Sequence, residues 1–453
     1  MRRVIAMLLC RLLRFAARVT HRGGTAMPGR IALKIDPSLL RTLASGVSVV
    51  CVTGTNGKTT CCRMLEQCFS EAGLDPLANR SGANLISGVT TEFVMNSSLS
   101  GRCRKKFAVI ECDEAAARRV FPELQPKLIV VTNLFRDQLD RYGEVTHTLE
   151  NIREGIRGVP SAVLCLNADC SLTSSLAGDL PNAHVFYGLE PGAVPSAPLP
   201  EISDALHCLR CKTRYEYDFV SYGHLGRFRC PRCGYCRPEA DVAVLSASFG
   251  ADESRIRIRT PSGECEAEVN LPAVYNVYNA LAAFTAAREA GLPESAVLQA
   301  LRTFRCGFGR MEKFALGQKG ARMLLVKNPA GCNQALQYLE SVREPYVLLA
   351  CLNDRGADGT DISWIWDADF ELLLSALPER IVVSGDRASD LFLRLKYAGV
   401  PPERITLERD YESIISSFER SELPLVLMTT YTAMLELRSV VVKHCGGTDF
   451  WEG

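Results

Sequence analysis

The chain has 453 residues, which is long enough for two or three domains that each bury a hydrophobic core. Hydrophobic residues make up 47% and charged residues 23%, which is ordinary for a soluble globular protein. The net charge of +1 argues against a general nucleic-acid binder, because such proteins normally carry a basic excess.

The first 45 residues predict an amphipathic helical segment. Arginines at positions 2, 3, 11, 14 and 18 surround a short apolar run, Ile5 to Cys10. This run is too short for a secretory signal and is interrupted by Arg11, so a targeting peptide is the least favoured interpretation. Two others stay open: a helix packed on the protein, and a helix that touches an anionic membrane surface. No stretch reaches the ~20 apolar residues that span a bilayer.

Apolar runs at 47–53, 107–111, 127–133 and 161–167 each end in polar residues, and a helical pattern covers 59–72. Strands that alternate with helices predict an α/β fold with a parallel sheet and helices on both faces. Ligands bind at the carboxyl ends of the strands in such sheets. Strand-like sequence resumes at Val242, and a further helix is expected from Tyr275 to Ala290. We assign residues 46–310 to this domain.

A second α/β pattern follows a cluster of glycines near 305–320. Strands are expected near 323–326, 346–351, 380–384 and 425–429. We therefore assign residues 311–453 to a smaller C-terminal α/β domain.

A glycine-rich loop follows the first strand and precedes the helix at 59–72. Its backbone N–H groups would point at phosphate oxygens at a helix N-terminus, Lys58 would neutralise the β- and γ-phosphates, and Thr59 would offer its hydroxyl to magnesium. Position 52, where the general phosphate loop has glycine, is valine, so this is the shorter Thr-Gly-Thr-x-Gly-Lys-Thr form. The predicted nucleotide-binding residues are Gly54, Thr55, Asn56, Gly57, Lys58, Thr59 and Thr60.

The sequence contains 19 cysteines, most of them isolated in apolar runs, which indicates free buried thiols in a reduced, cytoplasmic protein. Two pairs differ: Cys208-x-x-Cys211 and Cys230-x-x-Cys233 are separated by eighteen residues. This spacing is typical of a zinc ribbon, so residues 205–238 are predicted to form an insert that holds a structural Zn²⁺. Cys236 is a spare that could replace Cys233.

The short phosphate loop resembles that of the Mur ligases and of folylpolyglutamate synthase. Three more segments resemble theirs in order: Glu111-Cys-Asp-Glu114, Thr132 to Asp140, and Asn276-Val-Tyr-Asn279. The resemblance implies that ATP phosphorylates a substrate carboxylate and that an amine attacks the acyl phosphate. It also implies catalytic roles for Lys58 and Glu111, a Mg²⁺ ion near Thr59 and Glu111, and adenine contact by Asn279.

Departures from typical Mur ligases narrow the resemblance. Fewer than fifty residues precede the first strand, so the usual nucleotide-sugar-binding domain is not expected, and Gln138 replaces a usual histidine. With the cysteine insert and the segments 327–333 and 352–367, the chain resembles the MurT family across essentially its whole length. Members are ligase subunits that, with a GatD-type glutaminase partner, amidate the D-glutamate α-carboxylate of lipid II at the inner face of the plasma membrane.

This resemblance implies that the domain at 311–453 contacts the glutaminase, and that Asp361 reaches into the partner's active site to orient its histidine. Asp354 and Asp358 in the same loop are competitors for that role. No cysteine here lies in the Gly-x-Cys-x-Gly turn of a glutaminase, so ammonia must come from another chain. Two alternatives stay open: a stand-alone amino-acid ligase of the folylpolyglutamate type, and a zinc-ribbon ATPase that binds nucleic acid.

Overall fold

The computed structural model describes residues 1–19, 26–79, 83–136, 145–199, 204–306, 309–342, 344–375 and 378–446. The chain forms two compact units. The first contains residues 1–135 and 145–304, and the second contains 136–144 and 305–453. Gln138, the departure noted in the sequence, lies outside the described residues, as does the rest of the segment 137–140.

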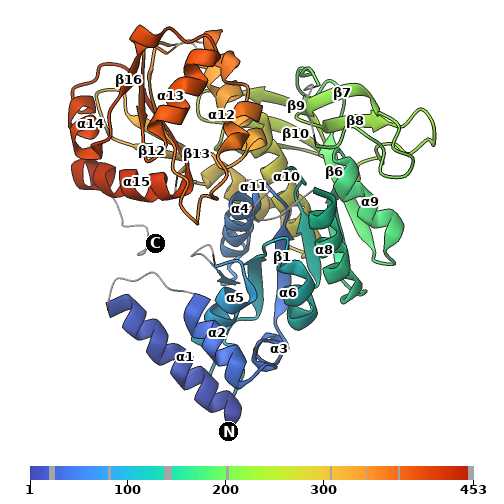
Figure 1. The fold of residues 1–453 in the computed structure, drawn as a ribbon. Helices are drawn as coiled ribbons and strands as arrows, with labels where there is room; N and C mark the ends of the chain where they lie inside the picture. Colours follow the sequence, from blue (N-terminus) through green and yellow to red (C-terminus); the bar gives the residue numbers. More distant parts are fainter. Residues whose placement is uncertain are drawn as a thin grey trace. The chain divides into compact units, whose positions relative to one another are not determined.

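A nine-stranded sheet forms the centre of the first unit (Figure 1). The strands are parallel from β2 to β9, as the alternating pattern predicts, and β9, β10 and β11 continue the sheet antiparallel. The antiparallel edge departs from the predicted parallel sheet because a short turn after β10 can join only antiparallel strands. In sheet order the strands are β2 (Leu77–Ala78), β3 (Phe107–Glu111), β1 (Ser48–Thr53), β4 (Leu128–Val131), β5 (Val163–Asn167), β6 (His184–Leu189), β9 (Val242–Phe249), β10 (Ser254–Thr260) and β11 (Gly263–Val269).

Helices cover both faces of this sheet, because its central strands are buried on both sides. On one face, α4 (Lys58–Glu71) packs against α10 (Val274–Glu289) and α11 (Glu294–Thr303). Right-handed crossovers place α6 (Ala117–Leu124), α8 (Val145–Arg157) and α9 (Ser171–Asp179) on the other. The chain therefore turns in opposite directions from β1 and β3, which creates a crevice for ligands at the strands' carboxyl ends.

The described residues of the N-terminal segment form three helices. They are α1 (Arg2–Val19), α2 (Ala26–Ile35) and α3 (Leu39–Ala44). Helix α1 packs on α2 and on α5 (Ile86–Met95) through Ala6, Met7 and Cys10, which are fully buried. None of the helices in the described ranges combines the length and the apolar character that a bilayer span requires.

The cysteine-rich insert forms a two-stranded antiparallel hairpin of its own, β7 (Glu216–Tyr222) and β8 (Leu225–Arg229). It follows β6 and precedes β9, two strands that are neighbours in the large sheet. The insert therefore lies outside the large sheet and does not change the order of its strands.

The second unit is built on a six-stranded sheet. The four strands expected from the sequence lie at its centre. The two edge strands were not predicted, because β12 is rich in charged residues and β16 has only three residues. In sheet order the strands are β12 (Arg310–Phe314), β13 (Ala321–Leu325), β17 (Leu425–Thr429), β14 (Val347–Cys351), β15 (Arg380–Ser384) and β16 (Ile405–Leu407). The helices are α12 (Pro329–Ser341), η1 (Ser363–Asp367), η2 (Phe370–Leu374), α13 (Ala388–Tyr397), η3 (Pro402–Arg404), α14 (Tyr411–Phe418) and α15 (Tyr431–Cys445).

Candidate active site

The glycine-rich loop connects the carboxyl end of β1 to the N-terminus of α4. Gly54 has φ +121° and Gly57 has φ +86°, a backbone region that side-chain-bearing residues rarely adopt. A Cβ atom on Gly54 would lie 2.4 Å from the Thr132 hydroxyl oxygen. Glycine is therefore required at this position both by the backbone angle and by the close approach of the loop after β4.

The loop that follows β4 holds the glycine-rich loop in place through reciprocal hydrogen bonds. The Asn56 N–H donates to Asn133 Oδ1 over 3.0 Å, and Asn133 Nδ2 donates back to the Asn56 carbonyl over 3.1 Å. The Thr55 hydroxyl donates to the Phe135 carbonyl and accepts from the Phe135 N–H, each over 3.1 Å. These hydrogen bonds fix the conformation of the glycine-rich loop.

Lys58 is the first residue of α4, and its side chain is 9% exposed. Its ammonium donates to the Gly54 and Thr55 carbonyls and pairs with Glu114 Oε1 at 3.1 Å. A buried ammonium needs such partners to offset its desolvation. The lysine is thus held at the mouth of the loop, where it can neutralise an anion.

Glu111 ends β3 beside the start of α4. The Thr59 hydroxyl donates to Glu111 Oε2 over 2.7 Å, and Asn84 Nδ2 contacts Oε1 at 3.4 Å. Asn79 brackets the Glu111 backbone, accepting from its N–H and donating to its carbonyl. The hydroxyl and carboxylate oxygens lie together, and these are ligands that Mg²⁺ prefers.

Asn279 on α10 contacts the glycine-rich loop directly. A Cβ atom on Gly57 would lie 2.0 Å from Asn279 Oδ1. Asn276, one turn earlier, donates to the Pro272 carbonyl over 2.7 Å. The structure thus places the Asn279 amide against the loop at the start of α4, and Asn276 secures the start of its own helix.

These residues assemble one site from four separated segments. Glycine-loop N–H groups, the N-terminus of α4 and Lys58 together form an anion-binding surface. Thr59 and Glu111 add oxygen ligands next to it. Thr60, the last predicted loop residue, is 5% exposed and lies in the first turn of α4. Such an arrangement can bind a nucleoside triphosphate with its metal ion and stabilise charge on a transferring phosphoryl group.

Glu114 and Asn133 contribute to this site although they were not predicted as site residues. Glu114 pairs with Lys58, and Asn133 anchors Asn56. Both lie in polar segments directly after buried strands, and this position is the signal that could have identified them. Their particular partners could not be inferred, because they depend on which strands neighbour β1.

The four predicted cysteine ligands form one cluster. The Sγ atoms of Cys208, Cys211, Cys230 and Cys233 all lie within 4.8 Å of one another. Two pairs approach closely, Cys208 to Cys233 at 3.5 Å and Cys211 to Cys230 at 3.4 Å. A tetrahedral zinc site with Zn–S bonds of about 2.3 Å requires S–S edges of roughly 3.8 Å, so the four thiols fit Zn²⁺.

Each Cys-x-x-Cys pair lies in a turn of the same form. The Lys212 N–H donates to the Cys208 carbonyl over 2.9 Å, and the Gly234 N–H donates to the Cys230 carbonyl over 3.1 Å. Lys212 (φ +62°) and Gly234 (φ +74°) both adopt a left-handed conformation. Hydrogen bonds with Thr213 lower the pKa of the Cys211 thiol to about 6, which favours the thiolate that binds metal.

The hairpin connects this cluster to the glycine-rich loop. Tyr222, at the end of β7, stacks on the Phe135 ring with centroids 5.8 Å apart, and the His224 ring lies 4.5 Å from the same ring. The backbone of Phe135 is hydrogen-bonded to Thr55. The insert therefore supports the residue that holds the glycine-rich loop.

Cys230→Ser is expected to abolish zinc retention and to lower the thermal midpoint of unfolding by several degrees. It should also raise the KM for ATP, because the hairpin supports Phe135 and Phe135 holds the glycine-rich loop. Metal analysis, thermal melting and nucleotide titration measure the three effects. Cys236→Ser is the matched control, because Cys236 is exposed and lies outside the cluster. Unchanged zinc content in Cys230→Ser would contradict the assignment.

In the second unit, three aspartates follow β14. Asp358 is 5% exposed and accepts hydrogen bonds from the Thr432 N–H and hydroxyl, while Asp354 pairs with Arg387 at 2.8 Å. Asp361 is partly exposed, and its Oδ1 accepts from the Ser363 N–H over 2.8 Å. Hydrogen bonds with Ser363 lower the pKa of Asp361, so it is ionised at neutral pH.

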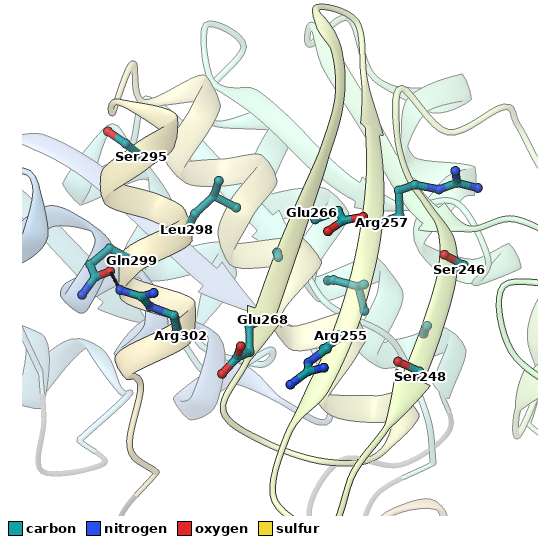
Figure 2. Close-up of a pocket in the computed structure, with 13 residues that line it drawn as sticks. Ser246, Ser248, Arg255, Arg257, Glu266, Glu268, Ser295, Leu298, Gln299 and Arg302 are labelled. Carbon is teal, nitrogen blue, oxygen red and sulfur yellow. Dashed lines mark hydrogen bonds between the residues drawn. The ribbon is translucent and has the colours of Figure 1, made fainter.

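A separate cavity of about 890 Å³ lies on the antiparallel edge of the large sheet (Figure 2). Figure 2 shows Gln299 and Arg302 of α11 on one side and charged residues of β10 and β11 on the other. Arg255 is directly opposite Glu268, and Arg257 is opposite Glu266. Such cross-strand pairs of opposite charge stabilise a solvated sheet surface, so this cavity is not our candidate site.

Comparison with known proteins defines the class to which this fold and site belong. Residues 52–287 match the Mur ligase middle domain family, and 325–434 match the MurT ligase C-terminal family. Among solved structures, MurF from Acinetobacter baumannii superposes with a TM-score of 0.67 at 16% identity, covering 91% of this chain and 80% of that chain. A folylpolyglutamate synthase from Mycobacterium tuberculosis, complexed with ADP and AMPPCP, gives 0.60 at 12% identity, covering 94% and 99%. The chain is a ligase with the Mur-ligase fold.

More similar relatives identify the family within this class. The chain is 35% identical over 423 residues to the lipid II isoglutaminyl synthase (glutamine-hydrolyzing) subunit MurT of Streptococcus pneumoniae, covering 93% of each. It is 38% identical over 415 residues to the subunit of that name from Staphylococcus aureus, covering 90% of this chain and 91% of the relative. The chain belongs to the MurT family, as its sequence motifs predict, and ATP and Mg²⁺ are the cofactors that membership implies.

Proposed function

We propose that this chain is the ligase subunit of a lipid II isoglutaminyl synthase. It would convert the α-carboxylate of D-glutamate in the stem peptide into an amide, using ATP and ammonia. The observation that carries the proposal is the cluster of Lys58, Thr59 and Glu111 at the glycine-rich loop, in a chain of the MurT family. Activation of a carboxylate by ATP requires a phosphate-binding loop and oxygen ligands for Mg²⁺ beside it, and this site has both.

The chemistry would proceed in two steps. The loop N–H groups and Lys58 would bind the β- and γ-phosphates, Thr59 and Glu111 would hold Mg²⁺, and Asn279 would contact the nucleotide. The substrate carboxylate oxygen attacks the γ-phosphorus, ADP leaves, and an acyl phosphate forms. Ammonia then attacks the acyl carbon, loses a proton, and releases inorganic phosphate and the amide. Both steps develop negative charge on phosphoryl oxygens, which Lys58 and the α4 N-terminus would stabilise.

The second unit, including residues 311–453, would bind a glutaminase that supplies the ammonia. Its surface carries large exposed apolar side chains, which are typical of protein interfaces. Tyr397 is 72% exposed and Trp366 is 50% exposed, and their ring centroids lie 5.7 Å apart. Asp361 lies in the segment directly before Trp366. Its ionised, partly exposed carboxylate suits it to orient a histidine of the partner better than buried Asp358 or paired Asp354.

The insert would hold Zn²⁺ through its four cysteines, with a structural role, because four thiolates leave no open coordination position. The substrate is attached to a membrane lipid, so the enzyme would act at the inner face of the plasma membrane. Nucleic acid has no part in this proposal.

Incubation with a lipid-linked stem peptide, ATP and Mg²⁺ tests the proposal. With glutamine and the partner, or with concentrated ammonium alone, mass spectrometry should detect replacement of the α-carboxyl OH by NH2, which forms the amide. If an added amino acid were joined to the substrate without any partner, the stand-alone ligase would be favoured. Absence of amide in both arms would contradict the proposal. Salt-sensitive binding to DNA or RNA would favour the nucleic-acid-binding alternative.

A further inference from the structure

Helix α1 has an apolar stripe on the side that faces away from the protein. The exposed fractions are 51% for Ile5, 50% for Leu8, 62% for Leu12 and 67% for Phe15. Their spacing of three or four residues places them on one helix face, opposite the buried Ala6 and Cys10. Figure 1 shows α1 lying along α2, and the face of α1 that carries the buried Ala6 and Cys10 packs on α2 and α5. A continuous row of large exposed apolar side chains is typical of an interaction surface, so we expect this face of α1 to bind a partner or a membrane.

The charge around the stripe identifies the chemistry of that occupant. The first 35 residues contain eight Lys and Arg and no Asp or Glu, although the whole chain is nearly neutral. On α2, Arg30 and Lys34 are exposed and lie on the same helix face as Met27, which is 52% exposed. The basic excess is therefore concentrated in the same segment as the exposed apolar side chains.

A second basic segment lies beside the first turn of α1. A Cβ atom on Gly101 would be 2.8 Å from Arg3 Cζ, which places the loop after α5 against this turn. That loop exposes Arg102, Arg104 and Lys106, together with Leu99 at 40% exposure. An apolar stripe bordered by cations matches the interface of an anionic bilayer, where acyl chains lie beneath negatively charged headgroups.

We propose that the exposed face of α1 docks on the surface of an anionic membrane, with Ile5, Leu8, Leu12 and Phe15 inserted at the headgroup boundary. The choice of a membrane rests on the proposed function, since a lipid-linked substrate is met there. Arg11 stabilises the helix in this position, because its guanidinium donates to the Val94 and Ser97 carbonyls at the end of α5. Helix α1 is thus fixed to the ligase by one face and presents the other to lipid.

Vesicle sedimentation of the full chain with its partner subunit tests this inference. Wild-type protein should sediment with vesicles of phosphatidylcholine and phosphatidylglycerol, less with phosphatidylcholine alone, and less at high salt. Leu8→Glu/Leu12→Glu should reduce the partition coefficient at least about tenfold, since two leucines leave the bilayer. Phe249→Glu is the matched control, because Phe249 is 40% exposed but lies on β9, and it should bind as wild type. Thermal melting and ATP binding should be unchanged in both variants.

Two results would overturn the docking inference. One is a wild-type protein that stays in solution with anionic vesicles, and the other is a double variant that sediments like wild type. If the stripe instead joins two copies, sedimentation velocity will show a dimer that the double variant dissociates, without vesicle binding. Amidation of a water-soluble stem peptide is measured in parallel. Amide formation without vesicle binding removes the docking inference alone, whereas vesicle binding without amide formation under any condition removes the proposed function alone.

Discussion

Replacing Lys58 by alanine is expected to reduce amide formation on the order of 10³-fold, with both glutamine and ammonium as nitrogen source. The ammonium lies at the mouth of the glycine-rich loop, where negative charge accumulates on the transferring phosphoryl group. Its loss removes the positive charge that Lys58 holds at the start of α4. Steady-state rates with both nitrogen sources measure the effect.

The control must separate lost catalysis from a damaged fold. Lys58 pairs with Glu114, which is 3% exposed, so the single variant leaves a buried carboxylate without its cation. Lys58→Met/Glu114→Gln removes both charges and should restore the thermal midpoint but not activity. Recovery of activity in the double variant would show that Lys58 serves only to neutralise Glu114. Retention of most activity in Lys58→Ala would contradict the catalytic role that we assign to Lys58.

Asp361→Asn is expected to lower the rate of glutamine-driven amidation but not the rate of ammonium-driven amidation. Glutamine-driven amidation should fall on the order of 10³-fold, because an amide cannot stabilise a charged histidine in the partner. Ammonium-driven amidation should stay within about twofold of wild type, since Lys58, Thr59 and Glu111 are untouched. The ratio of the two rates is the measurement, and Asp361→Glu should recover part of the glutamine-driven rate.

Asp354→Asn serves as the matched control in the same loop. Asp354 is paired with Arg387, so its loss should affect stability slightly and the ratio of rates not at all. Equal losses with both nitrogen sources in Asp361→Asn would remove the role that we assign to it. A selective glutamine defect in Asp354→Asn would transfer that role to Asp354.

Much of the fold could be predicted, because buried parallel strands are continuous apolar runs with polar residues at one end. The runs at 107–111, 380–384 and 425–429 coincide with β3, β15 and β17. The edge strands give no such signal, because charged residues interrupt β12 and β16 has only three residues. Their pairing depends on neighbours that are distant in sequence, which local patterns do not identify.

The candidate site was predictable where chemistry and spacing coincide. The residue types at Lys58, Thr59 and Glu111 indicate phosphate and metal binding by themselves. The hydrogen bonds that orient these side chains could not be predicted. Asn133 and Asn56 are 77 positions apart in the sequence, and they meet only because β1 and β4 are neighbours in the sheet. The position of Asn279 against Gly57 likewise depends on the packing of α10 on α4.

In the N-terminal segment, helical periodicity predicts a helix but not which of its faces is buried. Helix α1 has small side chains such as Ala6 on one face and large ones such as Leu12 on the other. A helical pattern alone would assign the larger side chains to the core. Only the structure reveals that the face with Ala6, Met7 and Cys10 packs on α2 and α5, because which face meets a neighbouring helix depends on tertiary packing.

Transfer of an isotopic label shows whether this site activates a carboxylate as an acyl phosphate. The stem-peptide substrate is labelled with heavy oxygen in its α-carboxylate and converted with ATP and ammonium, and the released inorganic phosphate is analysed by mass spectrometry. We predict that each phosphate carries a labelled oxygen from the carboxylate, and that Lys58→Ala forms little labelled phosphate. Amide formation with unlabelled phosphate would rule out the acyl phosphate.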